Sequence, residues 1–421
     1  MTIRFSSLKN AYQAMRSHTG GRAIRLYIPG AAAEPLALAD DMAQDPEMGR
    51  GVTCVGVWIP GMNATDWASL CDGAQTTFAT PAWSTSRRSG RLKILPLAYS
   101  QTWDWISRTP IDAAIVQVSP PDARGLCSYS LTADFTDAVL NRDVPVLGLL
   151  NPMLPIVRGA PSVSIDRFQW VAEVAHPPAT YDAGGDDALS RAVAAQVARL
   201  IDDGFALQTG IGKLPVAIMD ALKDRRGLRI HSGMVADSLI SLIDAGAIAS
   251  GEGAITAGAI MGSPTLGRRL ADDPRVRLVS VPNTHGYGVV SRIPGLAAVN
   301  SALEVDLFGQ ANAERTGARL VSSVGGLGDF LRGAGAAPGG LPIVALPSET
   351  ANGKISKIVP LLSPGVVTVG RTEIGIVVTE HGAADLRGLD TDARAEALIA
   401  IAAPIRRDEL AQAWAELRAQ L

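Results

Sequence analysis

Short apolar runs alternate with amphipathic segments from one end of the chain to the other. This alternation is typical of α/β proteins, in which helices cover both faces of a mostly parallel sheet. Near the start, Leu8, Tyr12 and Met15 recur at helical spacing and predict a first helix. The apolar runs predict strands at residues 23–28, 52–59, 92–97, 113–118 and 144–150 in the first half, and at 205–208, 228–231, 276–281, 320–324, 342–346 and 375–379 in the second.

A break in this pattern separates the two halves. Residues 175–187 read AHPPATYDAGGDD and contain two prolines, two glycines and no periodic apolar positions. Such composition is typical of a linker between domains. We therefore predict an N-terminal α/β domain over residues 1–180 and a C-terminal α/β domain, with Gly-rich loops, over residues 181–421.

Composition narrows the class of protein. The 421 residues hold 38 Lys and Arg against 41 Asp and Glu, a formal charge of −3, which disfavours a nucleic-acid binder. No apolar run approaches the ~20 residues of a membrane span, so we expect a soluble protein. Five basic residues precede the first acid, Glu34, a bias that also occurs in organellar transit peptides. The helical spacing of Leu8, Tyr12 and Met15 favours an ordinary first helix over a transit peptide. With the cysteine pattern described next, it leads us to expect a cytoplasmic protein.

The cysteines and histidines predict no metal site. Cys54, Cys71 and Cys127 are far apart and form no CxxC pair, which fits a reducing compartment. The five histidines do not fall at metal-ligand spacings, and the chain contains no HExxH, GxSxG or SxxK motif. Metalloprotease, α/β-hydrolase and β-lactamase chemistry therefore have no support.

The first segment with candidate chemistry is FALQTGIGKLP, residues 205–215. We expect a strand, two glycines and then a helix with Pro215 at its first position, where the missing N–H costs nothing. Gly210 and Gly212 allow a ligand to approach backbone N–H groups, and the start of a helix adds partial positive charge. The loop is a candidate cradle for an anion or an oxyanion, although a tight structural turn would look the same.

Five further segments carry polar residues at the ends of apolar runs. Acids among apolar neighbours are costly unless they are paired or functional, so Glu304 and Asp306 either cap loops, hold a subunit contact or do chemistry. Two of the chain's six lysines, Lys354 and Lys357, lie beside a Gly turn, where they suit phosphates as well as a solvated loop. The segments are RIHSGM (229–234), VNSALEVDL (299–307), SSVGGLGDF (322–330), NGKISKI (352–358) and VTEHGAADLRG (378–388).

Together these segments are more specific than any one of them. The chain resembles the acetyl-CoA hydrolase/transferase family of class I CoA-transferases, which includes 4-hydroxybutyrate CoA-transferase. The resemblance rests on LQTGIG, RIHSGM, NSALEVDLFGQ, GGLGDF, NGKISKIVP and VVTEHGAADLRGL, and on IDAAIVQVSPPDARGLCSYS in the first half. It implies two CoA-transferase-type α/β domains with the active site between them, a homodimer, coenzyme A as co-substrate with no other cofactor, and an acyl-CoA plus a small acceptor as ligands.

The resemblance also implies residue roles. The family's oxyanion hole carries over to the two Gly loops, at Thr209, Gly210, Ile211, Gly326 and Gly328. Its CoA site carries over to Gly210, Gly212, Asn283, Gly325, Gly326, Lys354 and Lys357. In the family a Glu carboxylate attacks the acyl-CoA and forms an anhydride and then a glutamyl-CoA thioester, which splits one difficult exchange into easier steps.

One position departs from the family pattern. The nucleophile of the family lies in a His-Thr-Glu-Met segment, and this chain has His231, Ser232, Gly233 and Met234. Three interpretations follow. The enzyme transfers the acyl group directly to water or another nucleophile without a covalent Glu; or Glu304 or Glu380 replaces the missing carboxylate in ordinary CoA transfer; or the protein is a CoA-binding partner that has lost its chemistry.

Overall fold

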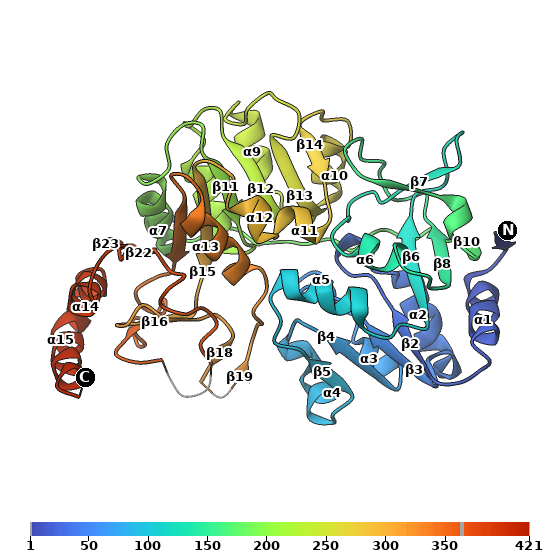
Figure 1. The fold of residues 1–421 in the computed structure, drawn as a ribbon, viewed down its shortest axis with the longest axis horizontal. Helices are drawn as coiled ribbons and strands as arrows, with labels where there is room; N and C mark the ends of the chain where they lie inside the picture. The colour runs from blue at the N-terminus through green and yellow to red at the C-terminus, as the bar shows by residue number, and fades with distance from the viewer. Residues whose placement is uncertain (1, 318, 363–365, 421) are drawn as a thin grey trace. The chain divides into compact units, whose positions relative to one another are not determined.

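The computed structural model describes residues 2–317, 319–362 and 366–420 and divides them into two compact units (Figure 1). Unit 1 comprises Met1–Asp182, Gly233–Asp237 and Gly251–Thr284; unit 2 comprises Ala183–Ser232, Ser238–Ser250 and His285–Leu421. Two segments from the second half of the chain therefore pack with the first half. The domain boundaries at 180 and 181 stay a prediction.

Unit 1 is built on an eight-stranded sheet with the order β1-β10-β8-β6-β2-β3-β4-β5. All of its neighbouring pairs are parallel, and central strands are fully buried runs such as AAIVQV in β6. Such strands require cover on both faces. The strands are β1 (Ile3–Phe5), β2 (Ile24–Tyr27), β3 (Val52–Val55), β4 (Gly73–Thr76), β5 (Leu92–Ile94), β6 (Ala113–Val118), β8 (Val146–Leu150) and β10 (Trp170–Glu173).

Capping residues and buried apolar faces explain where the helices of unit 1 form. Helix α1 starts after Ser7, whose hydroxyl accepts the N–H of Asn10, and it buries Leu8, Tyr12 and Met15 as predicted. The unit also contains α2 (Leu36–Gln44), α3 (Trp67–Leu70), α4 (Ser84–Arg88), α5 (Tyr99–Arg108), α6 (Thr136–Leu140), the antiparallel pair β7 (Leu126–Ser128) and β9 (Ser162–Ser164), the parallel pair β13 (Ile255–Ile260) and β14 (Val276–Leu278), α10 (Pro264–Ala271), α11 (Val281–Thr284) and the short 3₁₀ turns η1 (Ala31–Ala33), η2 (Pro46–Gly49), η3 (Pro81–Trp83) and η4 (Ile165–Arg167); α1 spans Leu8–His18.

The strand order of the first sheet reverses between β2 and β6. Open α/β sheets bind ligands in the crevice beyond the carboxyl ends of strands at such a switch point. The turn η1 follows β2 there and contacts both β6 and β13. Its first residue, Ala31, has φ of +49°, a conformation that costs a non-glycine residue energy.

Unit 2 repeats this plan. Within it the strand order is β12-β11-β15-β20-β22-β23, parallel except for the hairpin of β22 and β23. The order reverses between β11 and β15, so the switch point lies beyond Thr209 and Ser301. The strands are β11 (Ala206–Thr209), β12 (Arg229–Val235), β15 (Leu296–Ser301), β20 (Leu341–Ala345), β22 (Ile376–Thr379) and β23 (Gly382–Asp385).

The remaining elements of unit 2 cover this sheet or extend from it. A small sheet has the order β17-β16-β21, and the pair β18 and β19 is antiparallel. Helices α14 and α15, red in Figure 1, bury Leu398, Leu410 and Trp414 in a core cluster that also contains Val305 of the small sheet and Val344 and Val377 of the large one. These elements are α7 (Ala188–Ala198), α8 (Lys213–Ala221), α9 (Leu239–Asp244), α12 (Tyr287–Val290), β16 (Glu304–Asp306), β17 (Ala311–Asn312), β18 (Arg315–Thr316), β19 (Arg319–Leu320), α13 (Leu327–Ala336), β21 (Ile358–Val359), α14 (Thr391–Ala400), η5 (Pro404–Arg406) and α15 (Arg407–Arg418).

Several predicted elements differ from the structure. The strand predicted at 320–324 is wrong: only Arg319–Leu320 is extended, and a Gly-rich loop leads directly into α13. Pro215 is the third residue of α8, not the first, and it is still in the turn whose N–H groups have no partner within the helix. The strand predicted to end at His231 continues to Val235, so Gly233 lies inside β12. Residues 175–187 form no helix or strand, as predicted.

Candidate functional site

The first Gly loop lies at the switch point of unit 2. Thr209 ends β11, and its carbonyl oxygen accepts the hydroxyl of Ser232 from β12 at 3.1 Å. Gly212 caps α8 with φ of +109°, and no atom lies within 4 Å of a Cβ placed at Gly210 or Gly212. Ile211 lies between them and is half-buried. The loop therefore presents backbone to open space at the start of a helix, an arrangement suited to a negatively charged oxygen.

Two amide side chains join β11 to β15 beneath this loop. Gln208 and Asn300 exchange hydrogen bonds of 3.3 and 2.7 Å between their side chains, and both are buried. Paired amides satisfy each other's donors and acceptors without introducing charge. They fix the spacing of the two strands from which the switch point is built.

The second Gly loop meets a buried histidine. A Cβ at Gly326 would lie 2.6 Å from Nε2 of His285, so this position accepts only glycine without a shift. Burial and the neighbouring His231 lower the pKa of His285 to about 3, which keeps its imidazole neutral at physiological pH. Gly325 has φ of +58°, and Gly328 in the first turn of α13 has open space at its Cβ position. His285 thus links the segment RIHSGM to the loop GGLGD.

Glu380 follows β22 at the same edge of the sheet. Its two carboxylate oxygens accept the N–H and the hydroxyl of Ser348 at 2.8 and 2.6 Å, and the Nε2 of His381 lies 3.6 Å from Oε1. Burial lowers the pKa of Lys357, and Glu380 opposes that effect. The Lys357 N–H donates to the carbonyl of Ser348. Glu380 therefore holds the loop after β20 in place.

Other predicted residues lie elsewhere. Glu304 belongs to the small sheet, where its carboxylate accepts the amide of Asn312 at 3.2 Å. Lys354 is exposed and borders a hollow of about 270 Å³ that Arg406 also lines. Asn283 lies in α11 of unit 1 and donates to the hydroxyl of Ser280 at 3.3 Å. The structure thus brings Lys357 and Glu380 together but assigns Asn283 and the two lysines to different units.

Gly233 is the predicted position of most consequence, and it is grouped with unit 1. A Cβ at Gly258 in β13 would lie 2.8 Å from the carbonyl oxygen of Gly233 and 3.3 Å from the Cβ of Asp134. Asp134 is buried, and its carboxylate accepts the N–H of Phe135 at 2.7 Å and the hydroxyl of Tyr99. Burial raises the pKa of Asp134 to about 7. The Cβ of Asp134 and the carbonyl oxygen of Gly233 therefore both lie close to Gly258.

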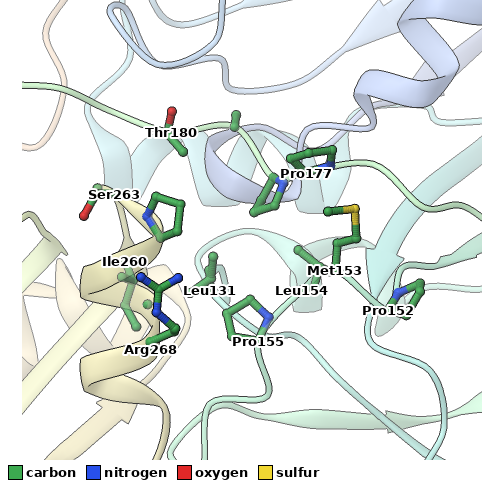
Figure 2. Close-up of a pocket in the computed structure, with 15 residues that line it drawn as sticks. Leu131, Pro152, Met153, Leu154, Pro155, Pro177, Thr180, Ile260, Ser263 and Arg268 are labelled. Atoms are coloured by element: carbon green, nitrogen blue, oxygen red, sulfur yellow. The ribbon is translucent and has the colours of Figure 1, made fainter.

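A cavity of about 350 Å³ opens in the same unit (Figure 2). Figure 2 shows its wall coming from the loop of Pro152 to Pro155, the segment of Pro177 to Thr180, and the start of α10, with the guanidinium of Arg268 at one side. Met153, Leu154 and Ile260 add apolar surface. Apolar concave pockets with few polar groups are typical sites for small organic ligands.

The described part of the chain supplies hydrogen-bond donors and acids to these loops. Among the described residues, no group of three or more His, Cys, Asp or Glu side chains could hold an ion, and no helix is long and apolar enough to cross a bilayer. Sequence reasoning missed Asp134, His285 and Ser348. Asp134 could have been noticed, since it is an acid between Ala133 and Phe135, the same pattern that drew attention to Glu304 and Asp306.

Comparison with known proteins gives consistent matches. The family model for the acetyl-CoA hydrolase/transferase C-terminal domain matches residues 262–414. The 4-hydroxybutyrate coenzyme A transferase of Clostridium kluyveri is 36% identical over 309 residues, which cover 72% of each chain.

Two solved structures share the fold. RipA from Yersinia pestis has a TM-score of 0.86 and 25% identity, over 98% of this chain and 99% of that one. The 4-hydroxybutyrate CoA-transferase from Porphyromonas gingivalis has a TM-score of 0.79 and 27% identity, over 100% and 98%. The predicted α/β fold with two large, mostly parallel sheets is confirmed.

Proposed function

Because the chain belongs to the acetyl-CoA hydrolase/transferase family, we propose that it moves the acyl group of an acyl-CoA thioester directly to water or to a small acceptor, without a covalent glutamyl intermediate. The chain is a member of a family of enzymes that act on CoA thioesters. In our proposal the attacking nucleophile is water or the acceptor and not a side chain of the protein.

Glycine at position 233 is the observation that carries this proposal. A hydrogen atom cannot attack a thioester or form an anhydride, so the covalent route needs another carboxylate. Both oxygens of Glu380 accept hydrogen bonds from Ser348, and Glu304 is bonded to Asn312 in the small sheet. Each candidate replacement therefore already has a structural role.

Direct attack of water on the thioester requires stabilisation of the negative charge that develops on the carbonyl oxygen; it does not require a nucleophilic side chain. When water adds to the thioester carbonyl, the oxygen becomes an anion that preorganised N–H groups can stabilise; losing one such donor typically costs ~2.7–4 kcal/mol. The loops at Thr209, Gly210 and Ile211 and at Gly326 and Gly328 support this role, because both expose backbone at helix starts. The proposed hole would stabilise the oxyanion in the same way whether water or a carboxylate has added to the carbonyl carbon.

The cavity of unit 1 supports an assignment for the acyl chain. Its walls are mainly proline, leucine, isoleucine and methionine side chains, which suit an aliphatic chain. We place the CoA moiety at the residues that resemble the family's CoA site, including Gly212, Lys354 and Lys357. A homodimer and a cytoplasmic location stay predictions.

One experiment separates direct transfer from the covalent route. The protein is incubated with acetyl-CoA or butyryl-CoA, thiol release is followed, and a parallel sample is treated with borohydride before peptide mass analysis. We expect protein-dependent thiol release and no modified glutamate. A reduced side chain at Glu304 or Glu380 would establish the covalent route, and absence of any thiol release would favour a CoA-binding partner protein.

Conventional CoA transfer through Glu380 is the second candidate. Its position at the strand-end edge, close to the partly buried Lys357, favours it over Glu304. It predicts that acetate accepts CoA from butyryl-CoA, giving acetyl-CoA and butyrate, and that Glu380→Gln abolishes this transfer. Under direct transfer the same variant keeps thiol release within about tenfold, because Gln still accepts the Ser348 donors with one oxygen.

A further inference from the structure

Without a nucleophilic side chain, the enzyme must activate a water molecule for attack on the thioester. Unit 1 contains a carboxyl group that could accept the proton of this water. We propose that Asp134 is the general base of this enzyme, taking the proton of the water that attacks the thioester. The inference rests on the proposed function, since a covalent glutamate would make an activated water unnecessary in the first step.

The position of Asp134 is the first argument. Its Cβ would lie 3.3 Å from a Cβ at Gly258, and that same point is 2.8 Å from the carbonyl oxygen of Gly233. The segment of Asp134 is hydrogen-bonded along β13: the N–H of Ala133 donates to Gly258 at 2.9 Å, and the N–H of Ile260 donates to Leu131 at 2.8 Å. Two neighbouring glycines and one carboxylate therefore share a small volume.

The first sheet has its switch point at β2 and β6, and the turn that follows β2 there contacts β13, the strand of Gly258. Tyr27 ends β2, and burial together with the Asp134 carboxylate raises the pKa of its hydroxyl well above the usual range. The turn η1 contacts β13 at the same place, with Ala31 in its strained conformation. Ligands of open α/β sheets bind at such points, and strained backbone is concentrated at functional sites.

An unpartnered hydroxyl is the second argument. The Oγ1 of Thr132 is buried and has no hydrogen-bond partner among the described residues, although Thr132 is only two residues from Asp134. A buried polar group without a protein partner calls for a water or a ligand. A water held between Thr132 and Asp134 would be the nucleophile itself.

The titration of Asp134 fits the task. Burial is the main reason that its pKa rises, while the N–H of Phe135 and the hydroxyl of Tyr99 oppose the rise by stabilising the carboxylate. The ionisable groups facing it, Tyr27 and Tyr99, have pKa values raised well above their usual range and stay neutral. A base whose pKa lies near the working pH is both available and strong.

The chemical step balances. The Asp134 carboxylate accepts a proton from water while the water oxygen bonds to the thioester carbon, and the carbonyl electron pair moves to oxygen. When the tetrahedral oxyanion collapses, the carbon–sulfur bond breaks, and the leaving CoA thiolate takes the proton back from Asp134. The products are a carboxylic acid and CoA, and Asp134 is again ionised.

Thiol release from butyryl-CoA tests the proposal in the full-length protein. We expect Asp134→Asn to lower kcat at least about 100-fold with KM within a few fold, and to remove the rise in rate with pH near 7. Asp143→Asn, which changes an exposed acid of the same unit, is the matched control and keeps the rate and the pH profile of the unmodified protein.

Tyr99→Phe provides a second variant with a readout that a structural role would not move. Loss of a donor to the carboxylate raises the pKa of Asp134 further, so the rising limb of kcat moves to higher pH while the maximal rate at high pH is largely kept. An infrared band of a neutral buried carboxyl group, present below pH 7 and missing in Asp134→Asn, provides a measurement independent of activity.

The outcomes distinguish the two proposals. A folded Asp134→Asn protein with unchanged kcat and pH limb overturns the role of Asp134 and leaves direct transfer standing. A wild-type protein that forms a borohydride-sensitive glutamyl adduct, or that releases no thiol, overturns direct transfer and with it the need for this base.

Discussion

The two switch points of this protein have the same topology, but the residues near them carry different chemical groups. In unit 2 the crevice beyond β11 and β15 is lined by backbone of two Gly loops, a pair of amides and a histidine kept neutral by burial. In unit 1 the turn after β2 contacts β6 and β13. Close to Gly258 of β13 lie the buried acid Asp134 and the carbonyl oxygen of Gly233, and the buried hydroxyl of Thr132 has no hydrogen-bond partner among the described residues. Under our proposals one fold plan would supply oxyanion stabilisation from the loops of unit 2 and a proton acceptor from unit 1, because the function of such a fold depends on its strand-end residues.

The largest test of this contrast concerns stability. The pKa of Asp134 is about 7 in the folded protein against 3.8 for an ordinary Asp, so the native state holds the extra proton between these values, and stability falls as pH rises through that window. Asp134→Asn removes the penalty of a buried charge, and its melting temperature gains on that of the unmodified protein as pH increases from 5 to 8. Because only the part of this window from pH 5 to about 7 is covered, the relative gain is limited to about 3 kcal/mol. An equal effect of the substitution at both pH values would contradict this.

A substitution in the first Gly loop of unit 2 is expected to affect the reaction rate more than the stability of the fold. Gly212→Ala places a side chain at φ of +109°, which shifts the backbone donors of the loop. We expect kcat for thiol release to fall about 100-fold. Gly246→Ala is the matched control, because Gly246 also has positive φ with open space at its Cβ position, but lies after α9. Equal rates in the two variants would remove the loop from the oxyanion site.

The cavity of unit 1 provides a smaller, more selective effect. Met153→Trp fills space between the prolines of Figure 2. We expect kcat/KM for hexanoyl-CoA to fall about tenfold, in line with 1–3 kcal/mol for misfit in an apolar pocket, and that for acetyl-CoA to change little. A uniform decrease for both thioesters would indicate that the acyl chain binds elsewhere.

The smallest effect is expected at the exposed lysine of unit 2. Lys354→Met should raise KM for acetyl-CoA about two- to fivefold at low salt, because an exposed ion pair contributes roughly 0.2–1 kcal/mol. Added potassium chloride screens the interaction, so the difference between variant and unmodified protein shrinks as salt rises. A salt-independent difference would point to packing instead of charge.

Sequence patterns predicted the fold well where burial dictates the strand. Fully apolar runs such as β6 and β20 can satisfy their surface only inside a sheet, so their positions were predictable to within a few residues. The pattern was insufficient at β13, where ITAGAI contains a glycine and small side chains. It was misleading at 320–324, where the apolar residues belong to a loop before α13.

The residues of the candidate site also differ in how well the sequence predicted them. Glycines and lysines at the loops of unit 2 could be noticed, because their spacing is local in the sequence. The neighbourhood of Asp134 could not be inferred: residues 99, 134, 233 and 258 come from four distant segments, and only the packing of Gly251–Thr284 with unit 1 brings them together. The pKa of Asp134 depends on that burial and has no signature of its own in the chain.

Prolines at positions 152, 155, 177, 178 and 264 form much of the wall of the unit 1 cavity. Their rings fix the backbone torsion φ, so the pocket is already formed before a ligand binds. Binding therefore costs little free energy for ordering the protein. A pocket with such a fixed wall selects acyl groups by shape. We expect it to accept a straight acyl chain and to exclude a branched one that would clash with a proline ring.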